Sequence, residues 1–166
     1  MADDHPVSIR PFTPGDFDAI VAITGEVFGP VSIDGLIEEM IGRPAVDWLT
    51  VKARAIRREV DGNPQGCFVA ECNGKVVGYV TTVIDRAASR GVVANLAVCA
   101  ACQRRGIGRS LLARAIESFR RGGLAQAKIE TLACNPAGQR LYPSMGFREV
   151  VRQIHYAMDL RDSQPT

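Results

Sequence analysis

The chain has 166 residues, 46% of them hydrophobic, and a formal net charge of +2. This length and apolar content predict one globular domain over residues 1–166 with a substantial core. The small charge, with basic residues mixed among acidic ones outside residues 104–121, excludes an extended nucleic-acid-binding surface. A small molecule or a peptide is therefore the expected partner.

Residues 1–6 are acidic and polar, unlike a signal peptide, and no stretch approaches the length of a membrane span. We therefore expect a cytoplasmic protein without a membrane partner. Five cysteines, an odd number, fit reduced thiols better than a disulfide framework. Cys99 and Cys102 have the spacing of two zinc ligands, but there is no second pair and the only histidines are His5 and His155, so no metal is expected.

The first part of the chain predicts a short strand followed by three helices. Val7–Phe12 alternates between apolar and polar residues, which is typical of a strand. The helices are indicated by apolar residues at helical spacing, with capping residues before them and glycine or proline after them. Their expected limits are Thr13 or Asp16 to Phe28, Ser32 or Asp34 to Ile41, and Val46 to Val60.

The middle of the chain predicts a hairpin, a further strand and a long helix. Asn73-Gly74 is the strongest hairpin signal, because both residues tolerate positive φ. The helix presents one apolar face and ends at Gly122-Gly123. The expected elements are strands at Cys67–Cys72, Lys75–Ile84 and Val92–Val98, and a helix at Gly106–Arg121.

The last part of the chain predicts a strand at Ala127–Ala133, a short helix at Pro136–Met145 and a closing hairpin of Phe147–Val151 with Ile154–Leu160. This order of elements implies a mixed sheet with helices on both faces. The apolar residues of the closing hairpin fit either a core-facing alternation or a surface that pairs two copies, so monomer and homodimer both remain open.

Residues 103–108, Gln-Arg-Arg-Gly-Ile-Gly, lie between a strand and a helix and predict an anion site. The first N–H groups of a helix have no intrahelical partner, and the helix dipole favours negative charge there. The glycines let a ligand approach the main chain, and Arg104, Arg105 and Arg109 make the region positive. No lysine follows Gly108 as in a Walker A loop, and a dinucleotide loop would need a further glycine and an acidic residue, so a nucleotide-binding enzyme is a weaker alternative.

Together with the preceding Asn95-Leu96-Ala97-Val98, this loop resembles the Gln/Arg-x-x-Gly-x-Gly/Ala loop of the GNAT superfamily of acyl-CoA N-acyltransferases. Residues 135–147 resemble the family's second motif, Asn-x-x-Ala-x-x-Leu-Tyr-x-x-x-Gly-Phe, in order and spacing. The resemblance covers nearly the whole chain. It implies an α/β (α+β) GNAT fold: a central mixed, mostly antiparallel twisted sheet of about seven strands, with helices on both faces and a splayed pair of parallel strands.

The same resemblance implies acetyl-CoA (coenzyme A) as cosubstrate and no metal. In the family the loop amides hold the pyrophosphate, and a bulged strand offers its main chain to the pantetheine arm, here at Leu96 and Val98. A fixed N–H of this strand would stabilise the charge that develops on the thioester carbonyl. Tyr142 is the implied catalytic acid for the departing thiolate. The residues implied to bind the cofactor are Leu96, Ala97, Val98, Gln103, Arg104, Arg105, Gly106, Ile107, Gly108, Arg109, Ser110, Asn135 and Tyr142.

The chain departs from the family pattern in two places. Pro143 restricts the backbone of Tyr142, and Gly138 stands where alanine is usual, so the ring of Tyr142 is expected to sit differently in a loosened helix. Ala94 occupies the position where many relatives carry the carboxylate that deprotonates the amine. The general base is therefore open among a water held by the backbone and the carboxylates of Glu26, Glu71 and Asp85.

The sequence therefore predicts an N-acetyltransferase that moves the acetyl group to a primary amine by direct attack in a ternary complex. A ping-pong route through Cys134 is disfavoured, because no histidine lies nearby in sequence. The alternative class is a catalytically degenerate acyl-CoA sensor or interaction module. The acceptor region, roughly residues 27–48, 86–90 and 151–155, has no signature. A peptide α-amine, as in ribosomal-protein N-terminal acetyltransferases, and a small amine both remain open.

Overall fold

The structure is a computed structural model that describes residues 6–161; His5 and the polar tail at 162–166 lie outside the described residues. The strands are β1 (Ser8–Pro11), β2 (Phe68–Cys72), β3 (Lys75–Asp85), β4 (Arg90–Val98) and β5 (Gln126–Ile129). The helices are α1 (Phe17–Val27), α2 (Ile33–Ile41), α3 (Trp48–Gly62), α4 (Ile107–Arg121) and α5 (Pro136–Ser144). Short 3-10 helices are η1 (Pro14–Asp16), η2 (Gly29–Val31), η3 (Pro64–Gly66) and η4 (Ala100–Cys102).

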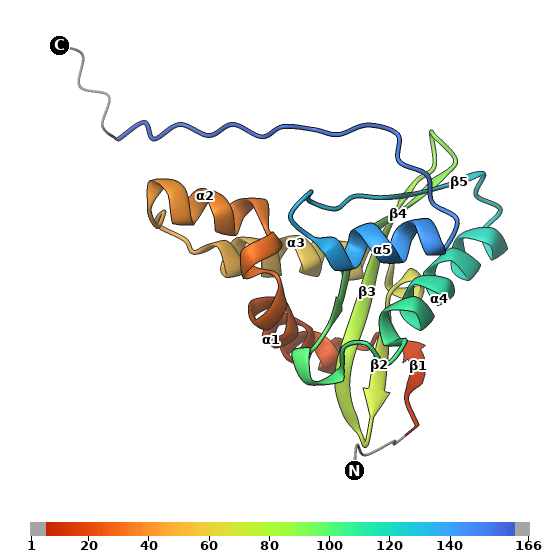
Figure 1. The fold of residues 1–166 in the computed structure, drawn as a ribbon. Helices are drawn as coiled ribbons and strands as arrows, with labels where there is room; N and C mark the ends of the chain where they lie inside the picture. Colours follow the sequence, from red (N-terminus) through yellow and green to blue (C-terminus); the bar gives the residue numbers. More distant parts are fainter. Residues whose placement is uncertain (1–5, 162–166) are drawn as a thin grey trace.

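The strands form a mixed sheet in the order β1-β2-β3-β4-β5, antiparallel except for the parallel pair β4 and β5. Helices α1 and α3 cover one face, and α4 covers the other, with α5 beside it (Figure 1). The predicted mixed sheet with helices on both faces is confirmed.

Each face of the sheet has its own apolar core, because successive strand residues point to opposite faces. On β2, Phe68 and Ala70 pack under α4, whereas Val69 between them packs under α1 and α3. The helix residues in these cores recur at helical spacing, and the most deeply buried are Ile20, Ile56, Val60, Leu111, Leu112 and Ala115. The sheet is therefore held rigidly from both sides.

Local signals placed most elements correctly. Asn73 and Gly74 have φ of 51° and 71°, as the predicted hairpin turn requires. Ser32, one of the two candidate caps, accepts a hydrogen bond from Gly35 N–H and starts α2. Helix α3 begins two residues later than expected, because the side chain of Asp47 caps it.

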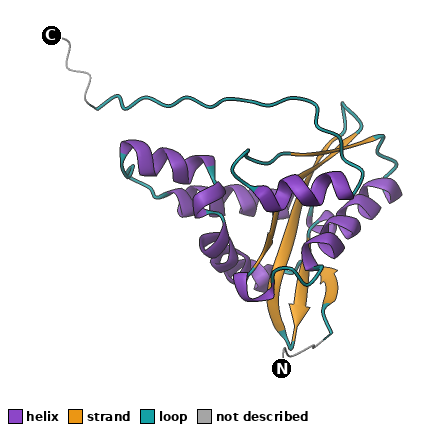
Figure 2. Ribbon diagram, viewed as in Figure 1, coloured by secondary structure: helices purple, strands orange, loops and turns teal. Residues whose placement is uncertain are grey.

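The expectation of about seven strands is wrong for the described residues, which form a sheet of five. Residues 147–160 contain no helix or strand and run as an extended segment away from α5 (Figure 2). Val150 and Tyr156 are 95% and 90% exposed, so the expectation that alternate residues of this segment face the core is also wrong. A strand needs a partner edge as well as an alternating pattern, and β5 itself ends at Ile129 rather than at residue 133. None of the described helices is both long enough and apolar enough to span a membrane.

An ion pair between Arg10 and Asp16 fixes the start of the fold, and we expect it to make the stability of the protein depend on pH. The Asp16 carboxylate, almost fully buried, accepts two bonds of 2.7 and 2.8 Å from Arg10 and one of 2.7 Å from Thr13 N–H. The Arg10 guanidinium lowers the pKa of Asp16 from 3.8 to about 2. We expect Asp16→Asn to lower the free energy of unfolding at pH 7 by about 1.5 kcal/mol, since a charge-assisted hydrogen bond is lost.

Because the folded-state pKa of Asp16 is depressed, this stabilisation is present above pH 4 and is lost as the pH falls through about 2. Urea unfolding of both proteins at pH 7 and at pH 2 tests the point. The difference in free energy of unfolding between the two proteins should be smaller at pH 2 than at pH 7. A difference that does not change with pH would contradict the stabilising role of ionised Asp16.

Candidate functional site

Strand β4 has an open edge in its second half. It pairs with β5 only through Arg90–Val93, opposite Gln126–Ile129, and beyond this the two strands diverge (Figure 1). At the same point the register with β3 slips by one residue at Ala94, which forms a β-bulge. The bulge and the splayed parallel pair expected from the sequence are confirmed.

The main chain of Leu96 and Val98 points to this open edge. Cys99 N–H bonds to the Val77 carbonyl of β3 over 2.9 Å, and in an antiparallel pair alternate residues face opposite edges. Val98 C=O accepts a bond of 3.1 Å from Gln103 Nε2, which lies on the open side. Leu96 and Val98, which the sequence predicts to meet a pantetheine arm, therefore have main-chain groups at the open edge, and the Val98 carbonyl there is bound by Gln103.

The loop that follows β4 ends in unpaired N–H groups. Arg104 and Gly106 adopt positive φ of 62° and 80°, and Gly106 provides no side-chain cap for α4. The first helical hydrogen bond runs from Ser110 N–H to Gly106 C=O over 3.0 Å. The N–H groups of residues 107–109 therefore have no intrahelical acceptor, and they lie at the helix start where the sequence predicts an anion site.

The packing around Gly108 leaves room for a side chain. A Cβ added there would lie 3.7 Å from Leu141 Cδ2 and 3.9 Å from Val98 Cγ2, which are ordinary contacts. Packing within the protein therefore does not require glycine at this position, as the prediction of a ligand close to the main chain here would expect. The exposed Arg104 and Arg105 stand beside it and supply positive charge.

Arg109 has a different role from the other arginines of the loop. Its guanidinium donates to Ser144 Oγ over 2.6 Å and contacts Met145 Sδ at 3.0 Å. The side chain thus ties the start of α4 to the end of α5, and only the main-chain N–H of Arg109 is left at the predicted anion site. The sequence predicted Arg109 in the site, but nothing near it in the sequence indicated that its side chain would bind Ser144.

Helix α5 holds the predicted acid. Asn135 Oδ1 accepts a bond of 3.3 Å from Gly138 N–H, so Asn135 caps the start of α5. The helix continues through Pro143 to its end. The Tyr142 ring meets Phe147 edge-on, with centroids 6.3 Å apart. Burial raises the pKa of Tyr142, which keeps its hydroxyl protonated at neutral pH.

Gly138 makes room for that ring. A Cβ at this buried position would lie 2.7 Å from Thr131 Oγ1 and 3.0 Å from Tyr142 Cε2. Alanine, usual in the resembling motif, would therefore displace one of these groups. The glycine loosens the helix by propensity, but here it also permits the observed position of Tyr142.

A buried polar cluster adds a carboxylate that the sequence reasoning missed. Glu59 Oε2 accepts bonds of 2.7 Å from Thr81 Oγ1 and 2.5 Å from Asn95 Nδ2. Burial raises the pKa of Glu59, and the Thr81 hydrogen bond and the charge of Lys52 partly offset this. A signal existed: Glu59 stands between Ile56 and Val60 on the apolar side of its helix, where a carboxylate is unusual.

The carboxylates considered from the sequence have other partners. Glu26 Oε1 accepts from Ala100 N–H over 2.9 Å. Glu71 is paired with Arg10 at 2.8 Å, and Asp85 accepts a 3.1 Å bond from a backbone N–H in its own turn. Each therefore stabilises a local junction of the fold.

The cysteines do not assemble a metal centre in the described part of the chain, where no group of three or more His, Cys, Asp or Glu side chains converges. Burial and the neighbouring Cys102 raise the pKa of Cys99 to about 11, so this thiol is neutral at physiological pH. Cys134 is exposed.

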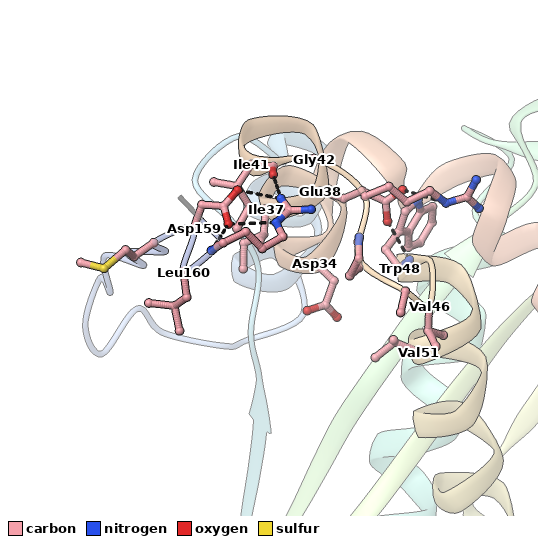
Figure 3. A pocket seen from close by; sticks show the side chains of 15 residues that line it. Asp34, Ile37, Glu38, Ile41, Gly42, Val46, Trp48, Val51, Asp159 and Leu160 are labelled. Carbon is pink, nitrogen blue, oxygen red and sulfur yellow. Dashed lines mark hydrogen bonds and ion pairs between the residues drawn. The ribbon is translucent and has the colours of Figure 1, made fainter. Parts of the chain in front are cut away.

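A hollow of about 490 Å³ lies between α2, the start of α3 and residues 158–161 (Figure 3). Its walls are mainly apolar and include Trp48 and Val51. Glu38 accepts a 2.9 Å bond from Trp48 N–H, whereas the Asp34 carboxylate points into the hollow. A smaller hollow of about 160 Å³ lies between α2 and residues 155–157. Of the expected acceptor segments, 27–48 and 151–155 line these hollows in part, and 86–90 does not.

Comparisons with known proteins agree with this geometry. Residues 33–147 match the Acetyltransferase (GNAT) family. N-alpha-acetyltransferase MAK3 of Arabidopsis thaliana is 32% identical over 102 residues, which cover 60% of this chain and 54% of that protein. The [ribosomal protein bS18]-alanine N-acetyltransferase of Escherichia coli K12 is 36% identical over 86 residues, 51% of this chain and 55% of that protein. The chain thus spans about half the length of the curated relatives it matches.

The fold is shared with solved structures. PaiA N-acetyltransferase from Thermoplasma acidophilum, in complex with coenzyme A, superimposes with a TM-score of 0.70 over 86% of this chain and 90% of that one, at 16% identity. The α/β architecture, with its mixed sheet and splayed parallel pair, is the GNAT fold. Since the family match covers most of its length, the chain belongs to the acetyltransferase (GNAT) family.

Proposed function

We propose that the protein transfers the acetyl group of acetyl-CoA to a primary amine by direct attack in a ternary complex. The observation that carries this proposal is the continuity of two main-chain surfaces. The open edge of β4 at Leu96 and Val98 leads directly into the unpaired N–H groups of residues 107–109. A long ligand with an amide-bearing arm and a pyrophosphate matches this sequence of groups.

In this assignment the bound acetyl-CoA supplies an activated thioester. The N–H groups of residues 107–109 bind the pyrophosphate, and the main chain of Leu96 and Val98 orients the arm and stabilises the carbonyl oxygen. Tyr142 gives a proton to the departing sulfur. The raised pKa of Tyr142 supports this role, because the hydroxyl is protonated when needed.

As acceptor we propose the α-amine of a peptide or protein N-terminus. The names of the relatives support this class, since both MAK3 and the bS18-alanine enzyme act on α-amines of proteins by name. The hollow beside α2 also supports it, because it is open, largely apolar and carries the Asp34 carboxylate, which suits an ammonium joined to a longer chain.

Calorimetric titration with acetyl-CoA, with ATP and NAD as controls, tests the cofactor, and Gly108→Ala tests the site. The added methyl group fits the protein but occupies the space proposed for the ligand. We expect Gly108→Ala to fold normally and to bind acetyl-CoA about tenfold or more weakly, equivalent to about 1.4 kcal/mol.

Gly62→Ala is the matched control, because an added Cβ there meets nothing within 4 Å. It should leave affinity unchanged. Binding of ATP in place of acetyl-CoA, or equal affinity in Gly108→Ala, would contradict the proposed site.

The acceptor is tested by mass spectrometry of peptides that begin with alanine, serine, methionine or glycine, beside spermidine and an aminoglycoside. Transfer to peptides alone supports the α-amine proposal. Transfer to the small amines alone would replace it. Binding of acetyl-CoA without transfer to any amine would favour the sensor alternative.

A further inference from the structure

The polar cluster of Glu59, Thr81 and Asn95 lies on the α3 face of the sheet, beside the open edge of β4. Asn95 immediately precedes Leu96, whose main chain faces that edge. The Asn95 side chain lies on the α3 face of the sheet and donates to Glu59 over 2.5 Å. The cluster is therefore one residue removed from the main chain assigned to the acyl group.

The orientation of the Asn95 amide leaves one buried atom without a partner. Nδ2 donates to both Glu59 Oε2 and Thr81 Oγ1, the latter over 2.7 Å. Turning the amide over would bring Oδ1 against an ionised carboxylate oxygen. Asn95 is only 3% exposed, and its Oδ1 has no hydrogen-bond partner among the described residues. A buried acceptor of this kind is normally satisfied by an ordered water or a ligand donor.

Helix α3 connects this cluster with the hollow proposed for the acceptor. Val51 lines the hollow, and Ala55 and Glu59 follow at intervals of four residues on the same side of the helix. Glu59 is half-buried, so its carboxylate is not sealed into the core. An amine that enters along this side of α3 approaches both the open edge of β4 and the cluster.

We propose that Glu59 accepts the proton of the attacking amine in place of the carboxylate missing at Ala94. This inference rests on the proposed function. The amine nitrogen forms a bond to the acyl carbon, the C–S bond breaks, and the sulfur leaves with the electron pair and takes a proton from Tyr142. The surplus proton of the amine passes to the carboxylate of Glu59 and from there to solvent.

Several charged or titratable groups face Glu59. Lys52 and Arg58 on its own helix lower the pKa of Glu59. From the neighbouring elements, burial raises the pKa of Cys67 to about 11 and also raises the pKa of Tyr79. Both of these groups stay neutral across the assay range, so neither contributes to the acidic limb that we expect from Glu59.

The test is the pH dependence of acetyl transfer to the alanine-initiated peptide by the unaltered protein and by Glu59→Gln. We expect kcat to fall by about 10²-fold at pH 7, the lower end of general-base effects, with unchanged acetyl-CoA affinity. The rate of the unaltered protein should level off above the pKa of Glu59. The rate of the variant should keep rising by about tenfold per pH unit until the amine itself deprotonates.

Thr81→Val separates this role from a structural one. Removing the hydroxyl that donates to Glu59 raises the pKa of the carboxylate, so the acidic limb should move to higher pH, which loss of packing alone would not cause. Glu117→Gln, on the exposed side of α4, is the matched control. Thermal unfolding shows whether each variant is folded.

The possible failures are distinguishable. If the unaltered protein transfers acetyl groups and folded Glu59→Gln retains both its rate and its acidic limb, the inference on Glu59 is overturned and the proposed function stands. If the unaltered protein acetylates none of the amines, the proposed function is overturned, and the inference falls with it.

Discussion

Replacing Tyr142 by phenylalanine is expected to lower kcat by about 10²–10³-fold, within the range of general acid catalysis, while the acetyl-CoA dissociation constant stays within about twofold. The ring packs edge-on against Phe147 and is half-buried, so its contacts survive the change. Only the hydroxyl is lost, and the leaving sulfur then departs without its proton. Steady-state rates with the alanine-initiated peptide, together with calorimetry, measure both quantities.

Tyr156→Phe is the matched control, since Tyr156 is 90% exposed and lies outside both motifs. The pH profile gives a second readout. Ionisation of Tyr142 should produce a basic limb at high pH, because burial raises its pKa, and this limb should be absent in the phenylalanine variant. An unchanged kcat would show that another group, or solvent, protonates the sulfur.

The parts of the site that the sequence predicted depend on local chemistry. A helix start with glycine before it exposes N–H groups wherever the helix lies, so the loop at residues 103–108 could be interpreted without its surroundings. Asn135 caps α5 through the residue three positions later. The hairpin at Asn73-Gly74 likewise needs only the φ preferences of two residues.

The prediction of a closing hairpin failed because strand pairing depends on residues far away in the sequence. Residues 147–160 alternate as a strand does, yet pairing depends on which edge is available and on how long it is. Strand β5 offers only four residues, and the loop after it turns toward α5. Near its end the segment instead meets α2, where the Arg161 guanidinium donates to the Ile41 carbonyl. No pattern within either segment specifies that contact.

The roles of Glu59 and Arg109 were hidden for a similar reason. Each makes its decisive contacts with residues more than twenty positions away: Glu59 with Thr81 and Asn95, and Arg109 with Ser144. The sequence offered Glu26, Glu71 and Asp85 as bases only by elimination. A carboxylate on the apolar side of a helix was the better signal, because burial of a charge requires partners.

Phe119→Ala is expected to lower the free energy of unfolding by about 3–5 kcal/mol, since it removes a buried aromatic ring. Phe119 is 3% exposed and lies over Gly91 of β4. A Cβ added at Gly91 would come within 2.4 Å of the ring carbons, so Gly91→Ala is also expected to destabilise, by about 1–3 kcal/mol through overpacking. Urea unfolding measures both variants.

The double variant Gly91→Ala, Phe119→Ala shows whether a clash with the Phe119 ring causes the destabilisation by Gly91→Ala. Once the ring is gone, the added methyl group has room, so Gly91→Ala should cost less in the Phe119→Ala background than alone. Simple additivity would contradict the assigned contact. Acetyl-CoA affinity of the folded protein should change far less than stability, because the opposite end of α4 is tied separately, by Arg109 to Ser144. The contact at Gly91 and Phe119 therefore secures the helix on the sheet, while the loop proposed to bind the cofactor keeps its own anchor.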